Sequence, residues 1–399
     1  MTDTTNDRDA ELKARIAWSH IVEPGDGLAN ELIDSMGAPG ALAAVLDQKE
    51  RESLAGSLAK SFVENEVPID VQATLDRWVA RHRAADADKP IPQGVQTLIP
   101  GDEHWPAQLD ELGAARPIML RVRGDASLLA SRSVAIVGAR ACTGYGEHVT
   151  VSIAEDVAHA GVAVVSGAAY GVDGAAHRAA LAVGGKTVAV LASGLDRAYP
   201  AGHSELIERI AANGAVVSEM PPGSAPTRHR FTMRSLLIAA LSSAVVVTEA
   251  GFRSGSLSAV TYADYLDKPV GAVPGPITSA ASAGTNNLIR DRAAVLVASG
   301  ADVLELIRDV QIERGGEQRA QAPWTSLSRR RTHELRSTRC SCSSRVPRAS
   351  RASSWICSGC SGSSRSRLRA RVAPWWLKRE LRATAARRSL THWRSKSLS

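Results

Sequence analysis

Two short apolar runs in this chain end in residues that suit the binding of an anion. Val134–Val137 is followed by a glycine and Arg140, and a second run is followed by Ser166 and Gly167. Parallel strands deliver their carboxyl ends to one edge of a sheet, where open α/β sheets bind ligands. We therefore expect guanidinium, hydroxyl and main-chain N–H groups to meet there and to favour phosphate. The alternative is an ordinary turn between strand and helix, with Arg140 solvated.

A third segment combines arginines with an aromatic ring. Arg228, Arg230, Phe231 and Arg234 lie within seven residues, directly before an apolar stretch that is typical of a helix. Guanidinium groups bind phosphates through paired hydrogen bonds, and a ring stacks on a base, so the segment favours single-stranded nucleic acid. The alternative is a solvated loop with Phe231 in the core.

A fourth segment, Ser254, Gly255 and Ser256, opens a predicted helix after a strand that ends near Glu249. Hydroxyls and main-chain N–H groups at the start of a helix bind phosphate well. We expect Glu249 to orient an arginine or a hydroxyl group rather than to act as a general base.

Catalytic and metal chemistry find little support in the sequence. Asp173 and His177 lie four residues apart and could form an acid–base pair, but no nucleophile lies nearby, and we expect Asp173 to cap the following helix. The chain has no His-Glu-x-x-His, Gly-x-Ser-x-Gly or P-loop motif. We therefore predict no catalytic residue, no bound metal and no cofactor.

The elements that must position these residues alternate between strand and helix from about residue 97 to 310. Such alternation predicts an α/β fold with a doubly wound, mostly parallel, extended Rossmann-type sheet. The expected strands are Ser133–Val137, Ala163–Ser166, Thr187–Leu191, Ala215–Ser218, Ala244–Thr248, Val270–Val273 and Val295–Ala298. The expected helices cover 146–160, 174–183, 203–213, 233–241 and 256–266.

Two further regions flank this domain. Residues 10–84 have apolar residues at helical spacing, with a break at 37–40, and predict an N-terminal helical module. Its role is open between a helix-hairpin-helix-like unit and a packing or dimerisation appendage. Residues 321–399 form a basic C-terminal tail of low complexity, rich in Arg and Ser, that we expect to be disordered or the product of a reading-frame change.

The frame hypothesis explains the unusual residues of the tail. Five of the eight tryptophans and four of the five cysteines lie there. A Leu-Leu-Gly-Leu-Leu codon run read one base late begins Cys-Ser-Gly-Cys-Ser, as at Cys357–Ser361. The spacing of Cys340 and Cys342 does not fit a zinc ribbon, so zinc is not expected.

Charge is divided unevenly along the chain. The whole chain has 48 basic and 41 acidic residues, of which the tail from Gln321 holds 19 basic and two acidic ones. The rest of the chain is therefore acidic, and its polyanion site must be a local basic patch. Cys142 is the single cysteine outside the tail, and the N-terminus has no apolar signal core, so we expect a cytoplasmic protein without a membrane span.

Taken together, the motifs resemble the DNA-processing protein A family (DprA, also called Smf). The resemblance covers about 97–310. The segments that carry it are Pro100–Leu109, Arg116–Gly124, Val134–Arg140, Ser166–His177, Thr187–Asp196 with Tyr199-Pro200, Ser218–Gly223, Glu249–Ser256, Ala272–Gly275 and Gly284–Ile289.

The resemblance implies a homodimer that binds single-stranded DNA and loads the RecA recombinase in natural transformation, without turnover. The implied DNA site is Arg140, Ser166, Gly167, the segment around Phe231 and Arg234, and Ser254–Ser256. Two departures stand out: the family has Arg-Asn-Arg where this chain has Arg234-Ser235-Leu236, and the basic tail replaces a winged-helix-like domain. The first departure predicts weaker phosphate binding.

Two other classes of protein remain as alternatives. One is a nucleotide-processing Rossmann enzyme of the phosphoribohydrolase kind, whose Pro-Gly-Gly-x-Gly-Thr signature is absent from this chain. The other is an interaction module that acts through residues 10–84 or through the tail.

Overall fold

The structure is a computed structural model that describes residues 4–64, 70–85 and 93–316. The described residues up to Ile307 belong to one compact unit. The tail at 321–399, with its cysteines and the proposed change of reading frame, lies outside the described residues.

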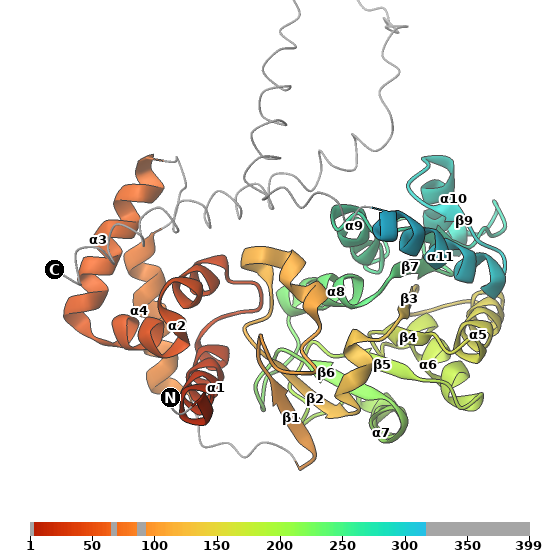
Figure 1. Ribbon diagram of the computed structural model, residues 1–399. Helices are drawn as coiled ribbons and strands as arrows, with labels where there is room; N and C mark the ends of the chain where they lie inside the picture. Colours follow the sequence, from red (N-terminus) through yellow and green to blue (C-terminus); the bar gives the residue numbers. More distant parts are fainter. Residues whose placement is uncertain (1–3, 65–69, 86–92, 317–399) are drawn as a thin grey trace, which may run out of the picture. The chain divides into compact units, whose positions relative to one another are not determined.

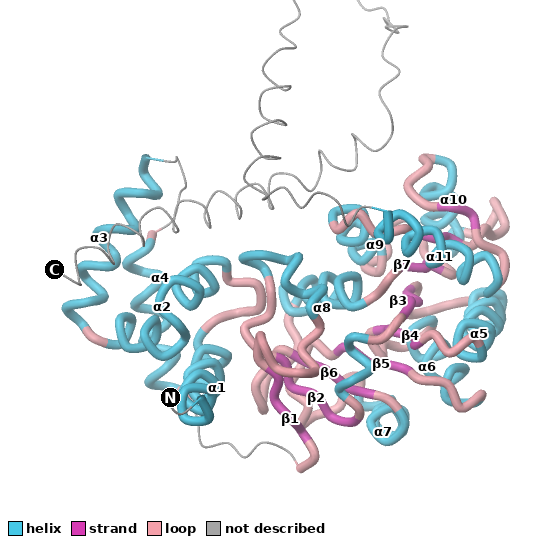
Figure 2. The backbone as a smooth tube through the Cα atoms, in the orientation of Figure 1, coloured by secondary structure: helices cyan, strands magenta, loops and turns pink. Residues whose placement is uncertain are grey.

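One nine-stranded sheet forms the centre of this unit, in the order β1-β2-β6-β5-β4-β3-β7-β8-β9 (Figures 1 and 2). β1 and β2 run antiparallel, and β2 pairs antiparallel with β6. The neighbours from β6 to β9 are all parallel, as the sequence predicted. The strands are β1 (Val95–Leu98), β2 (Leu120–Gly124), β3 (Ser133–Val137), β4 (Ala163–Ser166), β5 (Thr187–Val190), β6 (Ala215–Ser218), β7 (Ala244–Val247), β8 (Val270–Ala272) and β9 (Val295–Leu296).

Helices cover both faces of the sheet because alternate strand residues point to opposite sides. In β3, Val134 and Ile136 belong to the core formed with α5, α6 and α11. Ala135 and Val137 belong to the core formed with α8 and α9. These helices and their neighbours are α5 (Gly144–His159), α6 (Val172–Ala182), α7 (Ser204–Asn213), α8 (Arg228–Leu241), α9 (Leu257–Tyr265), α10 (Ala283–Arg290) and α11 (Gly300–Gly316).

All seven predicted strands are present, and three have the predicted bounds. β1 and β2 were not predicted, and β2 carries a charge in its middle. Arg121 in β2 is only 2 % exposed. Burial lowers the pKa of its guanidinium to about 10. A buried arginine breaks the apolar pattern by which a strand is identified.

The N-terminal residues form four helices, α1 (Thr4–Ile21), α2 (Gly27–Leu46), α3 (Gln48–Glu64) and α4 (Val71–Ala84). Trp18 and Trp78 meet edge to face at their centre, with ring centroids 5.4 Å apart. The predicted break lies at Gly37, whose φ of 74° interrupts α2 two residues before Pro39. No described helix is long and apolar enough to cross a bilayer.

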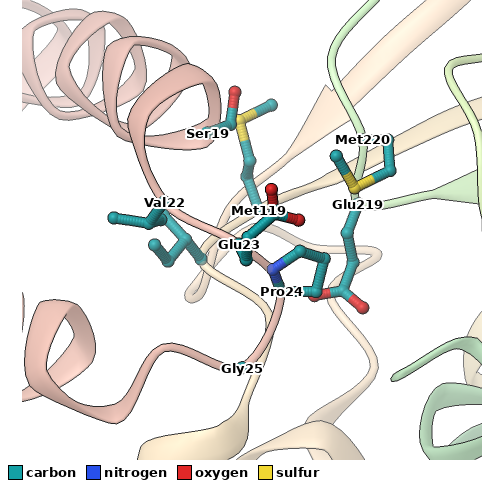
Figure 3. A pocket seen from close by; sticks show the side chains of 9 residues that line it. Ser19, Val22, Glu23, Pro24, Gly25, Met119, Glu219 and Met220 are labelled. Carbon is teal, nitrogen blue, oxygen red and sulfur yellow. The ribbon is translucent and has the colours of Figure 1, made fainter. Parts of the chain in front are cut away.

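Hydrogen bonds hold these helices against β2 and the segment before it. Arg15 Nη1 donates to the Ile118 carbonyl at 2.7 Å, and Arg121 Nη2 donates to Ser19 Oγ at 2.9 Å. A cavity of about 20 Å³ lies beside these contacts, and Pro24, Met119 and Met220 are among the residues that line it (Figure 3). That volume holds one water molecule at most.

Helix α8 is fixed at its C-terminal end by a buried lysine. Lys268 is 7 % exposed, and its Nζ donates to the carbonyls of Ala239 at 3.0 Å and Ser242 at 2.7 Å, and to that of Ala240. A cation suits this end of a helix because the last carbonyls lack partners. These bonds anchor one end of the helix that carries Arg228, Arg230, Phe231 and Arg234, which we call the basic–aromatic segment.

Candidate nucleic-acid interface

The winding of the sheet reverses at β3, which pairs with β4 on one side and with β7 on the other. Such a switch point, at the carboxyl ends of the strands, is where α/β sheets place their ligands. The loop after β3 is tied to both neighbours. Ala139 N donates to the Glu249 carbonyl at 2.7 Å, and Val172 N donates to the Ala139 carbonyl at 3.2 Å. Arg140 leaves this loop as an exposed side chain.

Arg140, Phe231 and Arg234, which we call the arginine–phenylalanine cluster, meet at this edge. The Cζ atoms of Arg140 and Arg234 each lie 5.0 Å from the centroid of the Phe231 ring. At this distance the ring attracts both guanidinium groups. Phe231 is half-buried, which leaves part of its ring exposed. The cluster thus places together two cations and a ring from the segments that the family resemblance assigned to one site.

Arg234 is partly buried and reaches across to the loop after β4. Its Nη1 donates to the Gly167 carbonyl at 2.8 Å. A Cβ at position 167 would lie 2.6 Å from Arg234 Cζ, so only glycine leaves room for the guanidinium. Gly167 therefore accepts a hydrogen bond from Arg234 and leaves space for its guanidinium, a role that the sequence alone did not reveal.

Asp173 supplies the nearby negative charge. It is 6 % exposed, and its carboxylate accepts a hydrogen bond from Ala169 N at 3.3 Å. Burial raises the pKa of Asp173, and the charge of Arg234 opposes that rise. Burial likewise lowers the pKa of Arg234, while Asp173 opposes that shift. The two charges stabilise each other beneath the surface of the cluster.

The prediction that Asp173 caps the following helix was wrong. Gly171 stands at the N-cap of α6, and Asp173 lies inside the helix. Its carboxylate holds the loop between β4 and α6 instead. Ala168 in this loop has a φ of 53°, an unusual conformation for a residue other than glycine, which contacts at the loop must hold in place.

Asp173 and His177 face different partners. His177 is fully buried, and its Nδ1 lies 2.7 Å from Thr187 Oγ1. Burial lowers the pKa of His177 to about 3. A neutral histidine beneath the helix is not accessible to a substrate, so the residue belongs to the core.

We expect His177 to make the protein less stable in acid. The unfolded chain binds a proton at this residue below about pH 6.5, whereas the folded chain does not until about pH 3. The free energy of unfolding should therefore fall by about 1.4 kcal/mol per pH unit below pH 6. Urea unfolding at several pH values should show a shallower fall for His177→Asn than for the wild type. Equal slopes would show that this histidine is already charged in the folded state.

Two other predicted ligand residues have structural partners. Ser166 is fully buried, and its hydroxyl donates to the Ile136 carbonyl at 2.6 Å, so this hydroxyl is engaged within the protein. Arg230 Nε and Nη2 donate to the carboxylate of Glu23 at 2.9 and 3.0 Å. Its Nη1 donates to the Ala225 carbonyl. Arg230 thus connects α8 to the N-terminal helices.

The basic–aromatic segment does not precede the helix but forms its first turns. α8 begins at Arg228, and the hydroxyl of Thr227 caps it by accepting a hydrogen bond from Arg230 N. Phe231 and Arg234, three residues apart, lie on one face of the helix, and the Arg234 guanidinium lies 5.0 Å from the ring. Arg230 is four residues before Arg234, but its side chain binds Glu23 in the loop between α1 and α2 instead. Arg228 is exposed at the start of the helix.

Glu249 and the serine turn lie on the other side of the switch point. The Glu249 carboxylate accepts from Thr143 N at 2.7 Å and from Thr143 Oγ1 at 2.8 Å. This confirms that Glu249 orients a hydroxyl. Ser254 Oγ and Ser256 Oγ lie 2.7 Å apart, and Gly255 between them is exposed just before α9. The serine turn follows β7, while Arg140 follows the adjacent β3.

Among residues 4–64, 70–85 and 93–316, no group of three or more His, Cys, Asp or Glu side chains is arranged to hold a metal ion.

A mostly parallel sheet with helices on both faces and basic groups at its switch point defines a Rossmann-type binding domain. Residues 96–308 match the DNA recombination-mediator protein A family, and the chain belongs to that family. Its relatives include DNA processing proteins named DprA and Smf.

Two curated relatives illustrate the extent of the likeness. The chain is 46 % identical over 257 residues to a putative DNA processing protein DprA of Mycobacterium tuberculosis, covering 61 % of this chain and 66 % of that protein. It therefore spans just under two thirds of that relative's length. It is 40 % identical over 203 residues to the DNA processing protein DprA of Streptococcus pneumoniae, covering 51 % of this chain and 71 % of that protein.

The X-ray structure of DprA from Streptococcus pneumoniae has the same architecture. It aligns with a TM-score of 0.54 at 32 % identity, covering 64 % of this chain and 96 % of that chain. The fold and the DNA-processing family are thus established together.

Proposed function

We propose that the chain binds single-stranded DNA at the carboxyl edge of β3 and β4, through the arginine–phenylalanine cluster. The observation that carries the proposal is the placement of two guanidinium groups 5.0 Å from one half-buried ring at the switch point. Phosphates would pair with the guanidinium groups, and a base would stack on the ring. Arg228 at the start of α8 and the turn Ser254–Ser256 would extend phosphate binding on either side.

Unpaired DNA suits this site better than duplex DNA. The ring of Phe231 can stack only on a base whose face is free, and duplex bases are already stacked. The region before the tail is acidic overall, so a local basic cluster supplies the attraction. Affinity should accordingly depend on few phosphate contacts and should fall only moderately with salt.

The test compares unpaired with paired DNA. Fluorescence anisotropy would follow labelled oligothymidylate and a duplex of equal length, over a range of salt concentrations, with the full chain and with a chain that ends at Ala320. We expect both chains to bind the single strand more tightly than the duplex. Equal binding of both forms by the shorter chain would reject the proposal.

The resemblance to the family extends the proposal to later steps. The bound strand would be protected in the cytoplasm and handed to the RecA recombinase during transformation and recombination, without chemical turnover. RecA loading would be tested by the rate at which RecA coats single-stranded DNA in the presence of this protein. No increase in that rate would remove this part of the proposal and leave strand binding intact.

We further propose that the protein acts as a homodimer, supported by the edge strand β9. Its side chains Val295 and Leu296 are 59 % and 50 % exposed at the end of the sheet. An exposed apolar edge strand is a surface that pairs readily with another chain. We expect Leu296→Lys to convert a dimer into a monomer in light scattering after size exclusion, whereas Lys186→Ala on the exposed surface should not. An unchanged dimer would place the interface elsewhere.

A further inference from the structure

We infer that the bases of the bound strand continue beyond Phe231 onto Tyr199 and Tyr170, two tyrosines that the sequence motifs did not assign to the site. This inference rests on the proposed binding of single-stranded DNA and states the path of the strand. Tyr199 is 40 % exposed and Tyr170 is 48 % exposed. Both belong to loops at the carboxyl ends of strands, Tyr199 after β5 and Tyr170 after β4.

Tyr199 continues the arginine–phenylalanine cluster directly. Its ring centroid lies 5.8 Å from that of Phe231, at an interplanar angle of 55°. The ring is thus supported by a neighbour while a large part of its surface remains exposed. A supported and partly exposed ring loses little side-chain entropy when a base stacks on it. Arg197, two residues earlier in the loop, is exposed and can pair with the phosphate of such a nucleotide.

Tyr170, in the loop after β4, is also supported by a neighbouring ring, that of His203 at the end of the loop after β5. Its ring meets the ring of His203 edge to face, with centroids 4.7 Å apart. His203 is itself held by a hydrogen bond between its Nδ1 and the Ala168 carbonyl at 3.0 Å. A side chain at Gly202 would collide with the Tyr170 hydroxyl, so the phenol end of Tyr170 lies against this glycine. Tyr170 therefore has a fixed position and an exposed flank.

Tyr199 contacts Phe231, and Tyr170 lies against His203 and Gly202 in the loop that also carries Tyr199. Tyr199 and His203 lie in the loop before α7. Tyr170 lies in the same loop as Gly167, whose carbonyl binds Arg234. Exposed rings that lie together beside guanidinium groups are the arrangement that proteins use to bind successive bases of a single strand. Core packing does not require this exposure, because tyrosines that serve only the core are largely covered.

The test uses leucine variants, which keep apolar bulk and remove the aromatic ring. Binding of the full chain to long oligothymidylate would be measured with excess unlabelled duplex present to occupy the basic tail. We expect Tyr170→Leu and Tyr199→Leu each to weaken binding by about 5- to 150-fold. Tyr170→Phe and Tyr199→Phe should restore wild-type affinity, and Tyr265→Leu on α9 serves as a matched control with no loss.

Binding to a DNA strand with abasic sites distinguishes the loss of base stacking from a change in the protein fold. The wild-type chain should bind it less tightly than intact oligothymidylate, whereas the leucine variants should bind the two strands more nearly alike. Strands carrying 5-iodouracil should also form light-induced crosslinks to Tyr170 and Tyr199, located by mass spectrometry.

Wild-type affinity in both leucine variants, together with a loss in Phe231→Leu, would overturn the extended path and leave the proposed function standing. Equal, weak binding by the wild type and every variant would overturn both.

Discussion

Arg140→Ala should weaken the binding of oligothymidylate by about tenfold or more, because it removes one charge-assisted contact to phosphate and one cation from the Phe231 ring. The side chain of Arg140 is exposed, so we expect the fold to be unaffected. The plot of log affinity against log salt concentration should become shallower by about 0.7, the value for one phosphate contact on a single strand. Anisotropy titrations across salt measure both quantities.

Arg132→Ala is the matched control for this prediction. Arg132 is also exposed, and it lies at the opposite end of the same strand, just before β3 begins at Ser133. The two variants lose the same charge, so a general electrostatic effect would weaken binding equally. Equal losses in the two variants would contradict a site at the carboxyl edge.

Arg234→Met should both reduce DNA binding and destabilise the fold, because Asp173 then remains buried without its nearby cation. The two groups interact through charge rather than through a direct ion pair, so we expect a loss of about 2 to 3 kcal/mol at pH 7, less than for a buried pair in contact. Urea unfolding measures the loss. Adding Asp173→Asn to this variant should recover much of the stability but not the DNA affinity.

The same variant has an expected pH dependence. Burial holds the pKa of Asp173 above its ordinary value of 3.8, and loss of Arg234 raises it further. The cost arises from the ionised carboxylate, so it is fully present above the folded pKa and disappears as Asp173 takes up its proton. The difference in stability between Arg234→Met and the wild type should therefore shrink as the pH falls toward 4. A difference that is constant with pH would show that Asp173 is not the cause.

The parallel part of the sheet could be predicted from the sequence because its strands are short runs of Val, Ile and Ala between glycine-containing turns. A strand buried on both faces by helices is a nearly continuous apolar run, and the polar residues of these strands lie only at their ends. The two antiparallel strands escaped prediction because their environment differs. β1 is partly exposed, and β2 buries Arg121 among apolar neighbours.

The cluster itself was predicted in part. Arg140 and Phe231 were identified by residue type, and only the resemblance to the family placed them in one site. The sequence could not show which arginine of α8 joins the cluster and which binds elsewhere in the protein. Arg230 and Arg234 have the same chemistry, and only the helical start at Arg228 and the position of Glu23 decide that one binds a carboxylate and the other reaches Gly167.

Ser166 and Asp173 show a second limit of prediction from motifs. Both lie where a phosphate ligand and a helix cap are expected, yet both are buried and bonded to the main chain. A sequence motif predicts the course of the backbone more reliably than the direction of a side chain. The sequence did not single out Tyr170 and Tyr199, because exposure of an aromatic ring leaves no mark in the sequence.

The most direct test of the account is a crystal structure of this protein with a short oligothymidylate. We predict a phosphate within hydrogen-bond distance of the Arg140 guanidinium and a thymine stacked on Phe231, beside the edge formed by β3 and β4. A strand bound only elsewhere, with that edge unoccupied, would contradict the account.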